Sequence, residues 1–238
     1  MLLKVEKVVK KFGGLSALSG VSFEVEEGTV IGLIGPNGAG KTTLFNCITG
    51  TLPITSGSIF FNGADISKLK SHMISKKGIA RSYQIVQPFG SMTTIQNAMV
   101  GGFCNSKSYD ESEAIAIKSL ELVHLSGKRN MVAKYLNLGE RKKLEIAKAL
   151  STQPKLLLLD EVMAGLTPAE VQEMVRIIHS INDAGVTLII IEHIMEAIMS
   201  LSKHIIVLNF GRKIAEGAPG EISVNEEVIQ AYFGVEEE

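Results

Sequence analysis

A glycine-rich stretch at residues 35–42, GPNGAGKT, constrains the fold of this chain more than any other feature. It fits the pattern G-x-x-x-x-G-K-[ST], which needs a strand before it and a helix after it. The apolar residues 29–34 predict that strand, and residues 41–48 predict a helix that stops at Gly50. The pattern therefore predicts a phosphate-binding loop at the carboxyl end of a strand, in an α/β fold.

The residue types in this loop suit a bound phosphate. Glycines let backbone N–H groups surround phosphate oxygens, and the N-terminus of the following helix favours the same negative charge. Lys41 would place a positive charge on the β- and γ-phosphates, and the Thr42 hydroxyl would be a ligand of Mg²⁺. A glycine-rich turn without a ligand is the alternative, which the flanking strand and helix disfavour. The predicted nucleotide-binding residues are Gly35, Pro36, Asn37, Gly38, Ala39, Gly40, Lys41, Thr42 and Thr43.

Two carboxylates follow a run of four leucines at residues 156–159. Such a run is typical of a buried parallel strand, whose carboxyl end faces the ligand crevice. Asp160 would then contact the shell of the Mg²⁺ ion, and Glu161 would polarise or deprotonate the attacking water. On its own this pattern is weak, because a solvated strand end looks the same; the phosphate loop favours the functional interpretation.

Strand-like and helix-like segments alternate along most of the chain, which predicts an α/β fold with a mainly parallel sheet. Residues 93–150 are different, since they show helical periodicity and no convincing strand. We therefore expect one domain over residues 1–238, with a nucleotide-binding core at 1–92 and 151–238. A helical subdomain at 93–150 would be inserted into that core.

Composition limits the other classes of function. Of the 238 residues, 45% are hydrophobic and 21% are charged, which is typical of a globular protein, and the net charge is −1. Nothing indicates a broad basic surface for nucleic acid. Cys47 and Cys104 lack metal-ligand spacing. The apolar runs are too short to span a bilayer, so we expect any role at a membrane to come through partner subunits.

Several shorter motifs occur in a fixed order along the whole chain. Residues 136–140, LNLGE, precede a basic helix and resemble the signature motif of ATP-binding cassette (ABC) proteins, usually written LSGGQ. Gln84 resembles the Q-loop glutamine of that family, and residues 164–167 resemble its D-loop. His193, after the predicted strand 186–191, resembles the switch histidine. Phe12 stands where the family places an aromatic ring under adenine.

This resemblance implies an α/β P-loop NTPase core with a mainly parallel sheet, an N-terminal antiparallel β part and an inserted α-helical subdomain. It implies ATP and Mg²⁺ as cofactors and a Mg-dependent ATPase activity. The implied catalytic residues are Glu161, His193 and Gln84, and the implied metal ligands are Thr42, Gln84 and Asp160. The implied nucleotide contacts outside the phosphate loop are Phe12, Asn137, Gly139 and Glu140.

Each of these motifs has a plainer alternative. His193 alone would be an ordinary residue at the start of a helix, and Phe12 alone would be a core aromatic. The signature motif also departs from the family pattern, because Asn137 replaces serine, Leu138 replaces glycine and Glu140 replaces glutamine. In the family, this turn caps the γ-phosphate of an ATP bound by the opposite subunit.

Further stretches resemble the ATP-binding subunits of branched-chain amino-acid uptake systems, among them residues 78–84, 144–147, 211–217 and 228–234. This branch implies an importer subunit on the cytoplasmic face of the membrane. The implied partners are a second ATPase subunit, two membrane-spanning permeases and, indirectly, an extracytoplasmic solute-binding protein. Import of urea or short amides and a soluble ABC-type ATPase are the alternatives. A P-loop kinase or GTPase is disfavoured by the signature motif, and the chain also lacks a guanine-reading N-K-x-D element.

Overall fold

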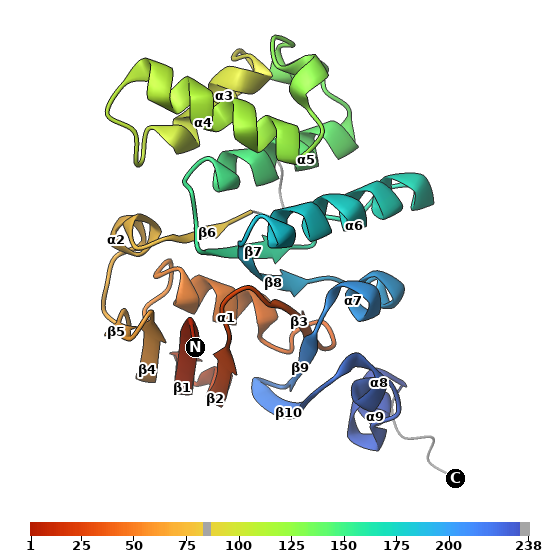
Figure 1. The fold of residues 1–238 in the computed structure, drawn as a ribbon. Coiled ribbons are helices and arrows are strands. Elements are labelled where there is room, and N and C mark those ends of the chain that lie inside the picture. Colours follow the sequence, from red (N-terminus) through yellow and green to blue (C-terminus); the bar gives the residue numbers. More distant parts are fainter. Residues whose placement is uncertain (83–86, 234–238) are drawn as a thin grey trace. The chain divides into compact units, whose positions relative to one another are not determined.

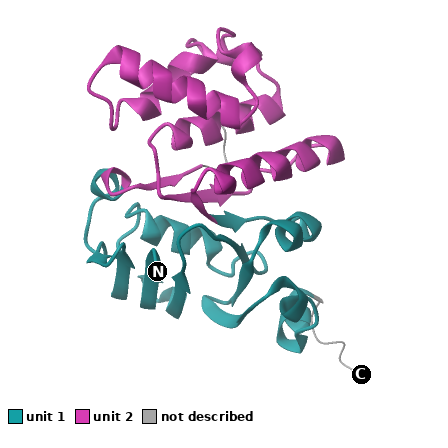
Figure 2. Ribbon diagram, in the orientation of Figure 1, with its two compact units in different colours: residues 1–74, 189–238 teal, residues 75–188 magenta. Residues whose placement is uncertain are grey.

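The computed structural model describes residues 1–82 and 87–233 of the chain (Figure 1). They form two compact units, one of residues 1–74 and 189–238 and the other of residues 75–188 (Figure 2). The helix α2 (Ser71–Lys76) and the strand β8 (Thr187–Ile191) each contain one of the boundaries. The first unit therefore combines the N-terminal and the C-terminal segments of the chain.

An antiparallel sheet fills the N-terminal part of the first unit, in the order β2-β1-β4-β5. Leu3 pairs with Val25 on one side and with Phe61 on the other, and all three side chains are buried. Buried and partly exposed residues alternate along much of β1, as expected for a sheet with one face against the core. The strands are β1 (Leu3–Phe12), β2 (Leu15–Val25), β4 (Ser56–Phe61) and β5 (Ala64–Asp65).

The same unit contains the strand that leads into the phosphate loop. This strand, β3 (Val30–Ile34), is buried at every position and pairs in parallel with β9 (His204–Asn209). An antiparallel strand, β10 (Arg212–Gly217), follows β9. The loop leads into α1 (Lys41–Ile48), and α7 (Met195–Leu201) contacts β3. The C-terminal helices, α8 (Pro219–Ser223) and α9 (Glu226–Phe233), lie beside β10 (Figure 1).

The second unit places helices beside a parallel pair of strands. The strand β6 (Ile79–Arg81) pairs with β7 (Leu156–Asp160), whose five residues are all buried. Three helices, α3 (Thr94–Gly102), α4 (Tyr109–Leu122) and α5 (Leu138–Leu150), contact one another. Short 3₁₀ turns at η1 (Ser126–Lys128) and η2 (Ala133–Tyr135) join α4 to α5, and α6 (Pro168–Asp183) follows β7.

The predicted fold class is confirmed: the first unit holds an antiparallel β part, and β3–β9 and β6–β7 are parallel pairs. Residues 93–150 contain helices, 3₁₀ turns and only an isolated bridge between Thr93 and Val132. The boundaries of single elements were predicted less well: apolar alternation in the sequence predicts strands at residues 2–9 and 21–25, and β1 and β2 are both longer than that. The predicted insertion, residues 93–150, lies inside the second unit, which spans residues 75–188. Its status as a separate subdomain therefore stays a prediction.

Among the described residues, no helix is both long enough and apolar enough to cross a membrane.

Candidate functional site

The backbone of the phosphate loop uses conformations that suit glycine. Gly35, Gly38 and Gly40 have φ values of 146°, 80° and 103°. A Cβ on Gly35 would lie 2.0 Å from the carbonyl oxygen of Leu208 in β9, so no side chain fits there. The left-handed Gly40 is the N-cap of α1 and has no side chain to cap the helix. The N–H groups in the first turn of any helix have no acceptor within the helix, and at α1 no N-cap side chain competes for them. This arrangement suits a bound anion.

Lys41, the first residue of α1, is buried beside this loop. Its ammonium group donates to the carbonyl oxygens of Gly35 at 2.6 Å and Pro36 at 3.0 Å. The lysine is thus held by the loop in which the sequence predicts it to act. Thr42, the predicted Mg²⁺ ligand, is exposed, and Thr43 is partly exposed.

Asp160 ends the buried strand β7 and is itself only 1% exposed. One of its carboxylate oxygens accepts a hydrogen bond from the Arg81 guanidinium at 2.5 Å, and both side chains of this ion pair are buried. The backbone N–H of Asp160 donates to the Ser82 hydroxyl at 3.2 Å. The ends of β6 and β7 therefore hold the aspartate as a paired anion, whereas the sequence indicated only a carboxylate at the end of a strand.

Glu161 follows directly and has a φ of 51°, in the left-handed region that non-glycine residues seldom adopt. Such a conformation costs on the order of 1–3 kcal/mol and persists only where the surroundings enforce it. The buried Lys142 of α5 donates to the carbonyl oxygen of Glu161 at 2.9 Å. The helix that follows the signature motif thus contacts the backbone of the predicted catalytic residue.

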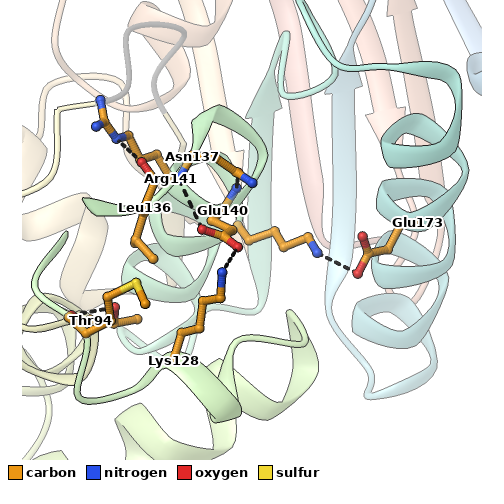
Figure 3. Close-up of polar contacts among 9 residues, drawn as sticks. Thr94, Lys128, Leu136, Asn137, Glu140, Arg141 and Glu173 are labelled. Atoms are coloured by element: carbon orange, nitrogen blue, oxygen red, sulfur yellow. Dashed lines mark hydrogen bonds and ion pairs between the residues drawn. The ribbon is translucent and has the colours of Figure 1, made fainter. Parts of the chain in front are cut away.

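The signature turn is built as the N-terminus of α5 (Figure 3). Asn137 is the N-cap: its side-chain oxygen accepts from the backbone N–H of Glu140 at 2.8 Å, and the Glu140 carboxylate accepts from the backbone N–H of Asn137 at 3.1 Å. In this capping box the carboxamide oxygen of Asn137 is the acceptor, and its NH₂ group is a further donor. The substitution of serine by asparagine therefore keeps a donor at this turn.

Two basic side chains hold the signature turn from outside the motif (Figure 3). Lys128, from the 3₁₀ turn η1, forms an ion pair with Glu140. Partial burial would raise the pKa of Glu140, but the hydrogen bonds from Lys128 and from the Asn137 backbone bring the pKa below its usual value. Arg141 donates to the carbonyl oxygens of Leu136 at 2.8 Å and Lys134 at 2.9 Å. Lys128 and Arg141 therefore both stabilise the signature turn.

The remaining predicted residues are placed separately. Phe12 ends β1 and is 45% exposed, with the Lys10 ammonium 4.9 Å from its ring centroid, so it is not a core aromatic. His193 lies two residues after β8 and is exposed. Gln84 lies outside the described residues. The phosphate loop, Phe12 and His193 belong to the first unit and the acidic pair and signature turn to the second, so their meeting in one site stays a prediction.

Comparison with known proteins identifies the family to which these features belong. A family model described as ABC transporter matches residues 18–164, and one described as branched-chain amino acid ATP-binding cassette transporter matches residues 212–238. The chain belongs to the ABC transporter family. It is an ATP-binding, ATP-hydrolysing cassette of the branched-chain amino-acid branch.

The individual relatives support this assignment over nearly the whole cassette. The high-affinity branched-chain amino acid transport ATP-binding protein BraF of Pseudomonas aeruginosa is 39% identical, and LivG of Salmonella typhimurium is 37% identical. In both comparisons 98% of each chain is covered. A crystal structure of the ADP conformation of an ABC transporter cassette is similar, with a TM-score of 0.89 and 33% identity over 98% of this chain and 99% of that one.

Several residues that contact the predicted site were not recognised in the sequence of the cassette. Arg81 and Lys142 are basic residues whose neighbours in the sequence do not indicate which acidic or carbonyl oxygen each one contacts. Lys128 lies 12 residues before Glu140, beyond the reach of any helical pairing rule. Tyr232, in the C-terminal segment, contacts the phosphate loop from 197 residues away.

Proposed function

We propose that this cassette binds ATP with Mg²⁺ at residues 35–43 and that Glu161 accepts a proton from the attacking water. The observation that carries the proposal is the run of left-handed glycines that leads directly into the N-terminus of α1. Backbone N–H groups there would hold the phosphates, and Lys41 would exchange its contacts with Gly35 and Pro36 for phosphate oxygens.

The donor set fits Mg²⁺, which prefers oxygen ligands from one or two side chains together with substrate phosphates. Thr42 would supply a hydroxyl, and Asp160 a carboxylate, which forms an ion pair with Arg81. Gln84 is the third predicted ligand. Bound Mg²⁺ would neutralise negative charge on the phosphates. Phe12 would stack under adenine, and His193 would contact the γ-phosphate.

We further propose that two cassettes enclose each ATP. Asn137, Gly139 and Glu140 form the start of α5, and the carboxamide of Asn137 uses its oxygen in the capping box. Its NH₂ group would be the donor at this helix N-terminus for the γ-phosphate of an ATP held by another chain. The second cassette would be a related chain or a second copy of this one.

The transported substrate is proposed from the names of the relatives, which are branched-chain amino acid transport proteins. The cassette would sit on the cytoplasmic face of the membrane, on two membrane-spanning permeases that receive substrate from an extracytoplasmic solute-binding protein. Affinity purification from native membranes, with the subunits counted, tests this arrangement. Recovery of the cassette without any permease would contradict it.

The exchange of Glu161 for Gln tests the site itself. The amide has nearly the same shape as the carboxylate but cannot accept a proton, so Glu161→Gln should retain ATP binding, lose nearly all hydrolysis and accumulate an ATP-bound dimer. Glu121→Gln, at an exposed position of α4, is the matched control and should hydrolyse ATP normally. A Glu161→Gln protein with normal turnover would remove Glu161 from the catalytic role.

A further inference from the structure

The C-terminal helix of the cassette reaches the first residue of the phosphate loop. The backbone N–H of Gly35 donates a hydrogen bond to the hydroxyl oxygen of Tyr232 at 2.7 Å. Tyr232 lies in α9, which contacts β10, and all of these residues belong to the first unit. The loop and the C-terminal segment are therefore joined by a direct contact within one compact body.

The backbone of Gly35 is fixed by packing and by hydrogen bonds at both its N–H group and its carbonyl oxygen. Its φ is 146°, and a Cβ added to it would lie only 2.0 Å from the Leu208 carbonyl oxygen, so the backbone packs directly against β9. Its N–H is bonded to Tyr232, and its carbonyl oxygen accepts from the Lys41 ammonium at 2.6 Å. One glycine therefore links the tyrosine hydroxyl to the lysine that is proposed to bind the phosphates.

The chemistry of the phenol suits this role. Burial raises the pKa of Tyr232, although the hydrogen bond from Gly35 opposes the shift. The side chain therefore stays a neutral phenol at pH 7, able to accept the Gly35 N–H on a lone pair. Phenylalanine would keep the aromatic ring but would leave the Gly35 N–H without this acceptor.

We propose that Tyr232 is a positioning residue of the ATP site, which holds the Gly35 peptide and, through it, the conformation of the loop around Lys41. This inference rests on the proposed role of Lys41 at the phosphates. Its consequence is that docking of α9 and binding of ATP are coupled. Because coupling between two sites is reciprocal, ATP would tighten the docking of α9 by the same factor by which docking of α9 tightens the binding of ATP.

The test compares Tyr232→Phe with the wild-type full-length chain. We expect the affinity for ATP to fall by about threefold to tenfold, the range expected for one hydrogen bond, and the Gly35 amide to exchange faster with solvent. The thermal unfolding midpoint should stay close to that of the wild type, since the ring is kept. Tyr109→Phe removes a hydroxyl from an exposed tyrosine of α4 and is the matched control. It should change neither the affinity for ATP nor the exchange rate of the Gly35 amide.

A second measurement follows hydrogen exchange in the C-terminal helix α9. In the wild type, ATP should slow hydrogen exchange of residues 226–233, and Tyr232→Phe should abolish that protection. If Tyr232→Phe binds ATP as tightly as the wild type and Gly35 exchanges at the same rate, the positioning role is wrong. Lys41→Ala separates the two proposals. If both Lys41→Ala and Tyr232→Phe bind and hydrolyse ATP normally, the proposed phosphate site is wrong. If Lys41→Ala is defective and Tyr232→Phe is normal, only the inference about Tyr232 is wrong.

Discussion

The ammonium group of Lys142 donates a hydrogen bond to the carbonyl oxygen of Glu161 at 2.9 Å. Lys142 lies on α5, whose N-terminus is the signature turn at Asn137. The same helix therefore carries the turn proposed to meet the ATP of another chain and the lysine that contacts the proposed catalytic residue of its own chain. A shift of α5 would change the backbone of Glu161 directly.

Lys142→Met should lower the rate of ATP hydrolysis by about tenfold or more and leave ATP affinity nearly unchanged. Glu161 holds a φ of 51°, and a hydrogen bond from a charged donor contributes about 1.5–3 kcal/mol toward keeping it there. Steady-state hydrolysis and equilibrium ATP binding are the measurements. Lys118→Met, at an exposed position of α4, serves as the control. Equal losses of affinity and rate would instead indicate general damage to the site.

Arg81→Met should destabilise the cassette by about 3–5 kcal/mol, because it leaves the Asp160 carboxylate buried without its ionic partner. Replacing both residues, as Arg81→Met with Asp160→Asn, should restore much of the stability but not the hydrolysis of ATP. Chemical denaturation of the two proteins measures the difference. A double variant that is as unstable as the single one would show that the ion pair is not the main role of Arg81.

Glu140→Gln tests the ion pair with Lys128 through its dependence on pH. The folded-state pKa of Glu140 is lowered, so its contribution to stability is present above the ordinary glutamate pKa of about 4.3 and is lost as the pH falls below it. At pH 7 the variant should be less stable by about 0.2–1 kcal/mol, because Lys128 is well exposed. Urea denaturation should show that the stability difference between the two proteins disappears at acidic pH. A difference that stays constant with pH would contradict a stabilising ion pair between Glu140 and Lys128.

Phe12→Ala should weaken ATP binding by about 1–3 kcal/mol if the exposed ring stacks on adenine. Binding of inorganic triphosphate, which has no base, should stay unchanged, and this ligand is the control. Titrations with both ligands decide the question. If ATP binds equally well to the variant, Phe12 has no contact with the base.

The sequence predicted best those parts of the site that are contiguous in the chain. Residues 35–42 and the pair Asp160 and Glu161 each follow an apolar run, so their place at a strand end was predicted correctly, and their chemistry stays a prediction. The contacts of Tyr232 with Gly35 depend on how distant segments fold together. Short elements such as β6, with three residues, show no periodicity long enough to predict them.

Phe89→Asp should uncouple ATP hydrolysis from transport while leaving nucleotide affinity intact. The ring is 48% exposed, with the Lys148 ammonium 5.3 Å from its centroid. Asn97 fixes the loop, since its side chain accepts from the Phe89 N–H at 2.8 Å and donates to the Phe89 carbonyl oxygen at 3.1 Å. An exposed aromatic ring on a loop held in this way suits a partner surface, which we expect to be a permease subunit.

Transport into membrane vesicles, ATP hydrolysis by the assembled complex and ATP binding by the isolated cassette should be measured together for this variant. Val224→Asp is the control, because it places the same charge at a 72% exposed apolar position away from the Phe89 loop in the sequence. It should behave as the wild type. Because the aspartate at position 89 would lie at a protein–protein contact and not near the nucleotide, only the coupling should suffer. Loss of ATP binding by the isolated Phe89→Asp cassette would mean that the loop supports the fold, and normal transport would mean that no permease contacts it.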